Sequence, residues 1–326
     1  MGTMLGVTSP SIVRFQQLHS DRDDGARQEL AEGLLDKTPQ ISPKFFYDAL
    51  GSTLFDAITR TDEYYPTRTE ARIFKRHAAE FARHIGPVHA MIDLGAADCR
   101  KAESLFATLR PALYVPVDIS VEYLRAAVAR IEGRHPDLPI LALGMDFSDR
   151  FILPAEVPAA NRLFFYPGSS IGNLSPDEAL ALLRGIRQAC TPDGAVLIGV
   201  DRVKAADVLE AAYDDALGIT AAFNLNALRH ANHILGGDFD VAQWRHVALY
   251  DAARHRVEMH LEARCEVTVT WDQTRRQFDA GERIHTECSY KYTPEMFESL
   301  LTRAGFQHII HRSDEDELFS VFCARA

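Results

Sequence analysis

The chain has 326 residues, enough for one large domain or two domains of ordinary size. Hydrophobic residues make up 47% of the chain and charged residues 25%, as in a soluble globular protein with a full core. A formal net charge of −11 argues against a nucleic-acid partner, whose phosphates require a cationic surface, but it leaves open a local site for a small ligand.

The five cysteines are scattered along the chain and no CxxC pair occurs, which favours a reduced chain without disulfides and without a metal site. The N-terminal sequence MGTMLGVTSPSIVRF has no basic region followed by an apolar core. No run reaches the roughly 20 apolar residues of a membrane span. We therefore expect a cytoplasmic protein without a membrane partner. The sequence does not fix the oligomeric state, and a monomer is compatible with it.

The first 68 residues are expected to form helices of a substrate lobe. One helix is predicted near 24–36, and the following helical pattern is interrupted at Gly51 and at Tyr65-Pro66. This segment is polar at its start, and neither a repeat nor a low-complexity tract appears in it.

Residues 69–201 show a different pattern, in which short apolar runs alternate with amphipathic helices. Successive runs end at Gly95, at Asp118, at Asp146 and at the turn PGSSIGN, and the fifth run is GAVLIGVDRV. Strands that alternate with helices of about ten to fifteen residues predict βαβ units and a parallel sheet.

After Asp201 the alternation stops. Residues 202–292 read as helices, followed by the period-two segment RVEMHLEARCEVTVTWD and a hairpin partner for it, GERIHTECSYKY. The α/β pattern resumes over 293–326 as a helix and two strands. We therefore predict a Rossmann-like α/β domain with a mostly parallel sheet and an antiparallel last strand. An insert at 202–292 should pack with 1–68 into a second, α+β lobe, with a ligand cleft between the lobes.

The strand ends suggest an adenosyl cofactor. A dinucleotide site needs several glycines where the pyrophosphate approaches, but the first loop, DLGAADC, offers only Gly95, so NAD is disfavoured. S-adenosylmethionine has no phosphate and therefore needs fewer glycines in this loop. Asp118 can accept hydrogen bonds from ribose hydroxyls, and Asp146 with Phe147 suits adenine. The alternative is structural, since a strand-terminal Asp often only caps a helix and a tight turn often wants a glycine.

Four segments resemble the S-adenosylmethionine-dependent amino-acid Nα-methyltransferases, whose best-known members act on L-histidine in the ergothioneine pathway. The likeness runs from about Pro43 to about Phe306. It implies a class I methyltransferase domain with a substrate lobe. It further implies an N-methyltransferase that moves methyl groups to the α-amine of L-histidine, giving trimethylhistidine (hercynine). The segments are YDALGSTLFDAITRTDEYYPTRTEARI, GSSIGNLSP, AAYDDALGITAAFNLNAL and GERIHTECSYKYTPE.

The resemblance also implies residue roles. Tyr64, Asn173 and Tyr213 are the catalytic candidates, and the last two match residues that hold the α-amine and carboxylate of the amino acid. Glu287 and Ser289 match residues that hold the imidazole. The cofactor contacts implied are Tyr47, Gly95, Lys101, Asp118, Asp146 and Phe147.

The chemistry agrees with these roles. Methyl transfer from a sulfonium is an in-line displacement, so the protein mainly aligns a neutral amine with the methyl carbon and needs no metal. Glu287 and Ser289 are two apart, so on a strand both face the same side. Glu287 can accept a ring N–H while Ser289 serves the other ring nitrogen.

Simpler readings exist for the same residues. Asn173 is also a common turn residue, because Asn tolerates left-handed geometry. The tyrosines could be core aromatics, and Glu287 could pair with an arginine across the sheet. His230 and His233 stand at helical spacing but lack a third ligand, so we read them as surface residues.

Three departures from the family pattern leave the substrate open. Ala97 replaces a second glycine of the cofactor loop, Ser170 stands where a Thr is common, and His260 stands where relatives carry a Trp. A sister enzyme for a tryptophan derivative or a modified histidine is therefore an alternative, although Glu287 argues against an indole. A non-catalytic S-adenosylmethionine-binding module is disfavoured, because it would not need the substrate residues.

Overall fold

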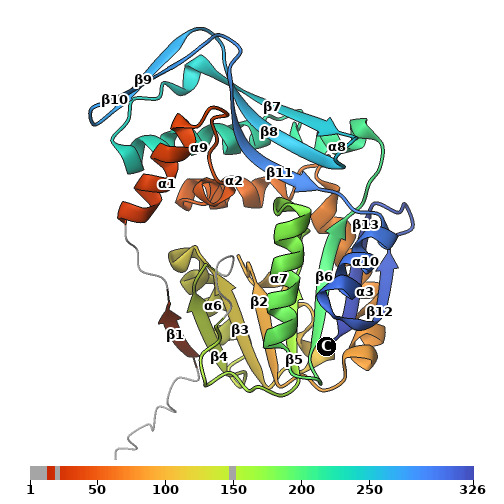
Figure 1. Ribbon diagram of the computed structural model, residues 1–326. Helices are drawn as coiled ribbons and strands as arrows, with labels where there is room; N and C mark the ends of the chain where they lie inside the picture. The colour runs from red at the N-terminus through yellow and green to blue at the C-terminus, as the bar shows by residue number, and fades with distance from the viewer. Residues whose placement is uncertain (1–12, 19–22, 147–151) are drawn as a thin grey trace, which may run out of the picture.

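The computed structural model describes residues 13–18, 23–146 and 152–326. The chain forms two halves, a large sheet flanked by helices and a smaller half of helices and antiparallel strands (Figure 1). No helix in these ranges is both long and apolar enough to cross a membrane.

The large sheet has eight strands in the order β1-β4-β3-β2-β5-β6-β13-β12. Neighbours from β1 to β6 are parallel, β13 is antiparallel to β6, and β12 is antiparallel to β13. This confirms the predicted Rossmann-like class I sheet with its antiparallel last strand. The strands are β1 (Val13–Gln17), β2 (Ala90–Leu94), β3 (Leu113–Asp118), β4 (Ile140–Gly144), β5 (Arg162–Tyr166), β6 (Ala195–Asp201), β12 (Gln307–Ser313) and β13 (Phe319–Arg325).

Helices cover both faces of this sheet, which is why β2, β4 and β6 are buried along their whole length. One face packs on α7 (Pro176–Ala189) and α10 (Pro294–Ala304). The other packs on α3 (Tyr65–Ile85), α5 (Phe106–Leu109) and α6 (Val121–Arg134), with the short α4 (Arg100–Glu103) between them. The chain reverses its direction of progress across the sheet between β2 and β5, the usual position of a ligand site in open α/β sheets.

The smaller half is built around a three-stranded antiparallel sheet in the order β11-β8-β7. Helices α1, α2 and α9 pack together over this half, and β9 and β10 form a separate hairpin (Figure 1). The elements are α1 (Asp23–Leu35), α2 (Ala49–Ile58), α8 (Ala206–Tyr213), α9 (Ile219–Leu235), β7 (Trp244–Asp251), β8 (Arg256–Ala263), β9 (Val267–Trp271), β10 (Thr274–Phe278), β11 (Arg283–Tyr290) and the 3-10 turns η1 (Pro43–Phe46) and η3 (Val241–Gln243). A further 3-10 turn, η2 (Ser170–Asn173), lies between β5 and α7 in the larger half.

The N-terminal segment departs from the expectation of helices alone. Its strand β1 pairs in parallel with β4 at the edge of the large sheet. Val13 and Phe15 pack against the sheet's core, and this pair of apolar residues in a polar segment was too short a signal to predict a strand. The predicted domain boundaries at 68, 201 and 292 stay predictions.

Two local expectations were wrong. Gly51 does not break a helix but lies inside α2, where a side chain would collide with the Phe46 carbonyl oxygen at 1.6 Å. Glycine there permits a close backbone approach rather than a turn. The period-two segment from Arg256 to Trp271 is not one strand but two, β8 and β9, which belong to different sheets.

Candidate active site

A pocket lies where the carboxyl end of β5 meets the smaller half. The large sheet contributes the turn residues Gly168, Ser169, Ser170 and Asn173. The smaller half contributes the rest, and five of the predicted residues besides Asn173 are among them. The lining from that half is Tyr47, Phe55, Ile58, Tyr64, Ala212, Tyr213, Thr220, Phe223, Met259, Glu287 and Ser289.

The turn between β5 and α7 is shaped by its small residues. Gly168 and Ser169 take the left-handed conformation, with φ of 80° and 60°. A side chain at Gly172 would lie 2.8 Å from the Tyr290 carbonyl oxygen, so β11 can approach the turn only because this residue is glycine. Ser175 then caps α7 in a reciprocal capping box with Glu178.

Asn173 is not in left-handed geometry, so the turn does not need an asparagine there for conformational reasons. Its side chain lines the pocket and is half-buried. Its amide forms no hydrogen bond with any residue in the described part of the chain. An amide in this position has both a donor and an acceptor for a ligand.

Glu287 is on β11 and is 7% exposed. Burial raises the pKa of its carboxyl group to about 7, although nearby Lys291 opposes the shift. Across residues 13–18, 23–146 and 152–326, no side chain forms a hydrogen bond or ion pair with this carboxylate, so the alternative of an arginine partner does not hold. A buried acceptor without a protein partner is costly unless a ligand supplies one.

Ser289 and Tyr213 meet beside Glu287. The Tyr213 hydroxyl donates to Ser289 Oγ at 2.7 Å, and Lys291 Nζ donates to both oxygens, at 2.9 and 2.8 Å. Glu287 and Ser289 both line the pocket, as expected for alternate residues of a strand. The intervening Cys288 contacts His285 instead.

Lys291 belongs to a buried charge cluster that sequence reasoning missed. Its ammonium forms an ion pair with Asp201 at 2.8 Å, and Asp201 also binds Lys204 at 2.7 Å and the Tyr65 hydroxyl at 2.8 Å. Burial tends to raise the pKa of Asp201, but the two lysines outweigh it and hold that pKa below its ordinary value. The signal was present, since Lys291 continues the alternation of Glu287 and Ser289 by two residues.

Aromatic side chains form the remaining wall of the pocket. Tyr47 packs edge-on against Phe55 and Phe223, with ring centroids 5.8 and 5.7 Å apart, and Tyr64 packs edge-on against Phe55 at 6.3 Å. Burial keeps the pKa of Tyr47 and of Tyr64 well above the ordinary value, so both hydroxyls stay protonated. These tyrosines are neither purely core nor surface residues.

The predicted cofactor residues Gly95, Lys101, Asp118 and Asp146 are here called the cofactor edge. Gly95 and Asp146 follow β2 and β4, Asp118 is the last residue of β3, and Lys101 lies in α4. Gly95 is exposed with φ of 67°, and open space lies where a side chain would be. Asp146 is also exposed. Phe147 lies outside the described residues.

Asp118 is held by the backbone, but not as the helix cap that the structural alternative supposed, because the N-cap residue of α6 is Ser120. Its carboxylate accepts hydrogen bonds from the N–H groups of Ala97 and Ser120, at 2.9 and 2.8 Å. Burial raises the pKa of Asp118, and these hydrogen bonds only partly offset the effect. Each oxygen keeps a further lone pair, so these backbone hydrogen bonds and ligand binding are compatible.

Lys101 connects the cofactor edge to the pocket. Its ammonium pairs at 2.7 Å with Glu70, a fully buried residue of α3. Glu70 also accepts the backbone N–H of Gly168 in the pocket turn, at 2.8 Å. Any side chain on Gly168 would lie 2.9 Å from Lys101 Nζ. The cofactor edge and the pocket therefore adjoin.

His230 and His233 do not form a site. His230 is half-buried and contacts the Phe45 carbonyl oxygen, while His233 is exposed. In the part of the chain that the structure describes, no three His, Cys, Asp or Glu side chains are grouped to hold a metal ion.

Comparisons with known proteins point in one direction. A family model described as "Histidine-specific methyltransferase, SAM-dependent" matches residues 26–326. The histidine N-alpha-methyltransferase of Mycolicibacterium smegmatis is 37% identical over 291 residues, which are 87% of this chain and 89% of that protein. Ergothioneine biosynthesis protein 1 of Neurospora crassa is 31% identical over 280 residues, 83% of this chain and 31% of that protein.

Among solved structures, a "possible exported protein" from Bordetella parapertussis is similar with a TM-score of 0.52. The likeness covers 92% of this chain and 86% of that one at 12% identity, and it bears on the fold alone.

Proposed function

The chain belongs to the family of histidine-specific, S-adenosylmethionine-dependent methyltransferases, and we propose that it transfers methyl groups to the α-amine of L-histidine. Successive transfers would give trimethylhistidine (hercynine). The relative from Neurospora crassa is named for ergothioneine biosynthesis, and we propose the same process for this chain.

One observation carries the substrate proposal. Glu287 presents a buried carboxylate to the pocket with no partner among the described residues, and the Ser289 hydroxyl stands two residues away on the same face. An imidazole ring can satisfy both groups, because it has two nitrogens. An indole has only one ring N–H and would leave a polar group unpaired.

The residues of the cofactor edge fit S-adenosylmethionine. Open space beside Gly95 leaves room for its amino-acid tail, Asp118 has lone pairs for ribose hydroxyls, and the Lys101 ammonium suits a carboxylate. When bound, the cofactor supplies a methyl group on a sulfonium. We propose contacts from Tyr47, Asp146 and Phe147 as well.

The chain's own residues would hold the amine in line with that methyl group. We propose that the Asn173 amide holds the α-amine. We further propose that Tyr213, whose only hydroxyl proton is donated to Ser289 Oγ, acts on the substrate through Ser289 and not on its carboxylate. Tyr64, in the aromatic wall, limits how the amino acid can turn. Such alignment is the main catalytic need of a displacement at carbon, because no bond to the protein forms.

The core packing supports our proposed division of the chain. One core cluster joins residues between Leu30 and Tyr65 to residues between Leu209 and Ile284. This supports a substrate lobe made from 1–68 and 202–292, and a methyltransferase domain made from 69–201 and 293–326, with β1 as an added edge strand. We propose that the protein acts in the cytoplasm on a free amino acid.

Mass spectrometry of the purified protein with S-adenosylmethionine and L-histidine tests the proposal. We expect mono-, di- and trimethylated histidine to appear in succession. Product with another amino acid but none with histidine would overturn the substrate and leave the family assignment intact.

A further inference from the structure

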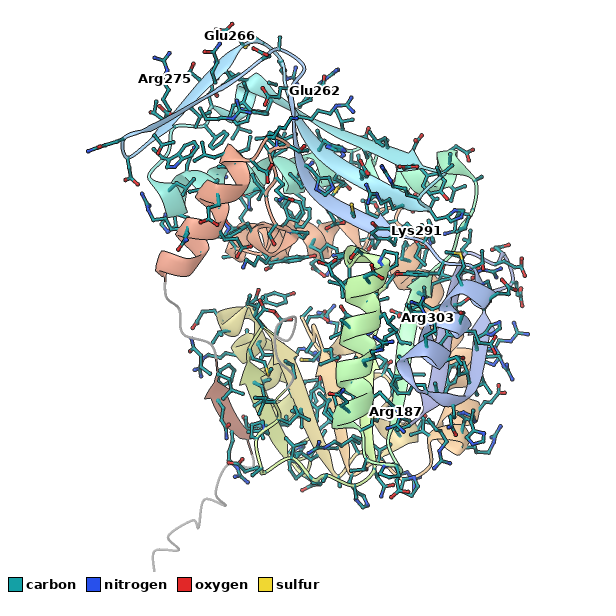
Figure 2. The ribbon with its side chains drawn as sticks, viewed as in Figure 1. Arg187, Glu262, Glu266, Arg275, Lys291 and Arg303 are labelled. Atoms are coloured by element: carbon teal, nitrogen blue, oxygen red, sulfur yellow. The ribbon has the colours of Figure 1, made fainter. Side chains whose placement is uncertain are left out.

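Lys291 occupies an unusual position for a lysine. It follows directly after β11, it is 1% exposed, and Figure 2 shows it at the junction of the two halves. An ammonium has three N–H donors and no acceptor. All of them are used, on the Tyr213 hydroxyl, on Ser289 Oγ and on the Asp201 carboxylate.

Counting donors and acceptors then fixes the direction of the Ser289 hydroxyl. A serine oxygen has two lone pairs and one proton. Ser289 Oγ accepts one hydrogen bond from Lys291 and one from the Tyr213 hydroxyl, so both lone pairs are engaged. Burial keeps the pKa of Tyr213 well above its ordinary value, and so its proton stays available for this bond.

The remaining proton of Ser289 has no acceptor among the residues that the structure describes, and Ser289 lines the pocket. This proton is therefore available to a ligand in the pocket. Glu287, in its ionised form, can only accept. The pocket thus offers one acceptor and one donor, side by side on β11.

A neutral imidazole matches this pair, since one ring nitrogen carries a proton and the other a lone pair. An imidazolium has two N–H groups and would face the Ser289 proton with a proton of its own. The buried Lys291 ammonium, 2.8 Å from Ser289 Oγ, also disfavours a second cation there.

We propose that Lys291 is a positioning residue that makes Ser289 a hydrogen-bond donor, so that the site selects the neutral imidazole of histidine in a single tautomer. The inference rests on the proposed function, because it concerns how that substrate is read. It adds a role for a residue that does not touch the ligand.

Ligands with an altered ring can distinguish a loss of the Ser289 hydrogen bond from a general loss of structure in the variants. The two pyrrolylalanine isomers each keep one ring N–H, which Glu287 can accept, but have no ring acceptor for Ser289. Binding is measured by calorimetry with S-adenosylhomocysteine present. For L-histidine, Ser289→Ala and Lys291→Met should each weaken binding about tenfold or more, as expected when one buried hydrogen bond is lost. For the better-bound pyrrolylalanine, the same changes should alter affinity less than about threefold.

Lys204→Met is the matched control. Lys204 binds the same Asp201 but contacts neither Ser289 nor Tyr213 in any hydrogen bond found within the described ranges. It should leave the preference for histidine over pyrrolylalanine unchanged. Equal weakening of both ligands by Lys291→Met, or the same selective loss with Lys204→Met, would overturn the proposal.

A measurement on the unaltered protein keeps the proposal testable if Lys291→Met fails to fold. Nitrogen-15 NMR of ring-labelled L-histidine, bound near pH 6, should show one protonated and one unprotonated ring nitrogen. Two protonated nitrogens would refute the inference. Methyl transfer is measured separately. Histidine that binds as an imidazolium and is methylated would refute this inference but not the proposed function. Histidine that binds as the neutral tautomer and is never methylated would refute the proposed function but not this inference.

Discussion

At the cofactor edge, Asp118 accepts two backbone N–H groups, whereas on β11 Glu287 is buried without any partner in the described chain. The first region is shaped by backbone, through a glycine with positive φ and two N–H groups. The second is shaped by side chains, which a buried lysine ties together. Changes to single side chains should therefore affect substrate recognition more sharply than cofactor binding.

The largest effect on stability is expected when Asp201 is replaced, because its carboxylate binds the Lys291 that supports Tyr213 and Ser289. Asp201→Ala would leave Lys291 and Lys204 as buried cations without their shared partner. Breaking a buried ion pair in this way should lower the free energy of unfolding by about 3–5 kcal/mol. Denaturant unfolding of the variant and of the unaltered protein measures this difference in the free energy of unfolding.

The control for Asp201 is an exposed ion pair. Glu315→Gln removes a partner of Arg76 at the surface and should cost less than about 0.5 kcal/mol. If Asp201→Ala and Glu315→Gln were equally stable, the buried ion pairs of Asp201 would not contribute to the stability of the fold as described.

Glu287→Ala should weaken substrate binding without weakening cofactor binding. Loss of a hydrogen bond to a charged group, about 1.5–3 kcal/mol, should weaken L-histidine binding by about 10- to 100-fold. Affinity for the cofactor should be nearly unchanged, as measured by calorimetry with each ligand. Equal losses for both ligands would show that Glu287 is not specific to the substrate side.

The pKa of Glu287 predicts a pH dependence in the ligand-free protein. Burial raises this pKa from 4.5 to about 7, so the folded state binds the proton more tightly than the unfolded state. The contribution to stability is therefore full below pH 4.5 and falls as the pH rises through about 7. Glu287→Gln should remove this loss and stabilise the protein by about 1–3 kcal/mol at pH 8, with little effect at pH 4.

Thermal or denaturant unfolding at the two pH values checks this sign. In the same pH range L-histidine should bind more weakly as the pH falls below about 7, because protonation removes the negative charge of Glu287 and makes it a weaker acceptor. A Glu287→Gln variant that is less stable than the unaltered protein at pH 8 would contradict the assignment.

The smallest effect is expected at the cofactor edge. Asp118→Ala removes the acceptor for the Ala97 and Ser120 N–H groups, and should cost about 1 kcal/mol of stability, as for other lost hydrogen bonds. Cofactor affinity should fall about tenfold while histidine affinity, measured without cofactor, stays the same. If Asp118→Ala weakened histidine binding and left cofactor affinity unchanged, Asp118 would belong to the substrate side rather than to the cofactor side.

Much of the large sheet could be predicted from sequence, because each central strand is a continuous apolar run followed by an amphipathic helix. The edge strand β1 could not, since only Val13 and Phe15 mark it. Gly51 was misread because a glycine that permits close approach and a glycine that ends a helix look alike in sequence.

The substrate residues were predicted through the resemblance, and the structure gathers Tyr47, Tyr64, Asn173, Glu287 and their neighbours around one pocket. Lys291 was missed because lysine is rarely buried. Its partners come from β6, α8 and β11, which are far apart in the chain and meet only in the folded protein.

The close approach of Tyr290 to Gly172 has a consequence for substrate length. The strand that would bind the ring and the turn that would hold the amine touch through backbone atoms, without a flexible side chain between them. The separation between ring and amine is therefore set by the fold. We expect an amino acid with one more methylene between its ring and its α-carbon to satisfy either the ring contacts or the amine contact, but not both.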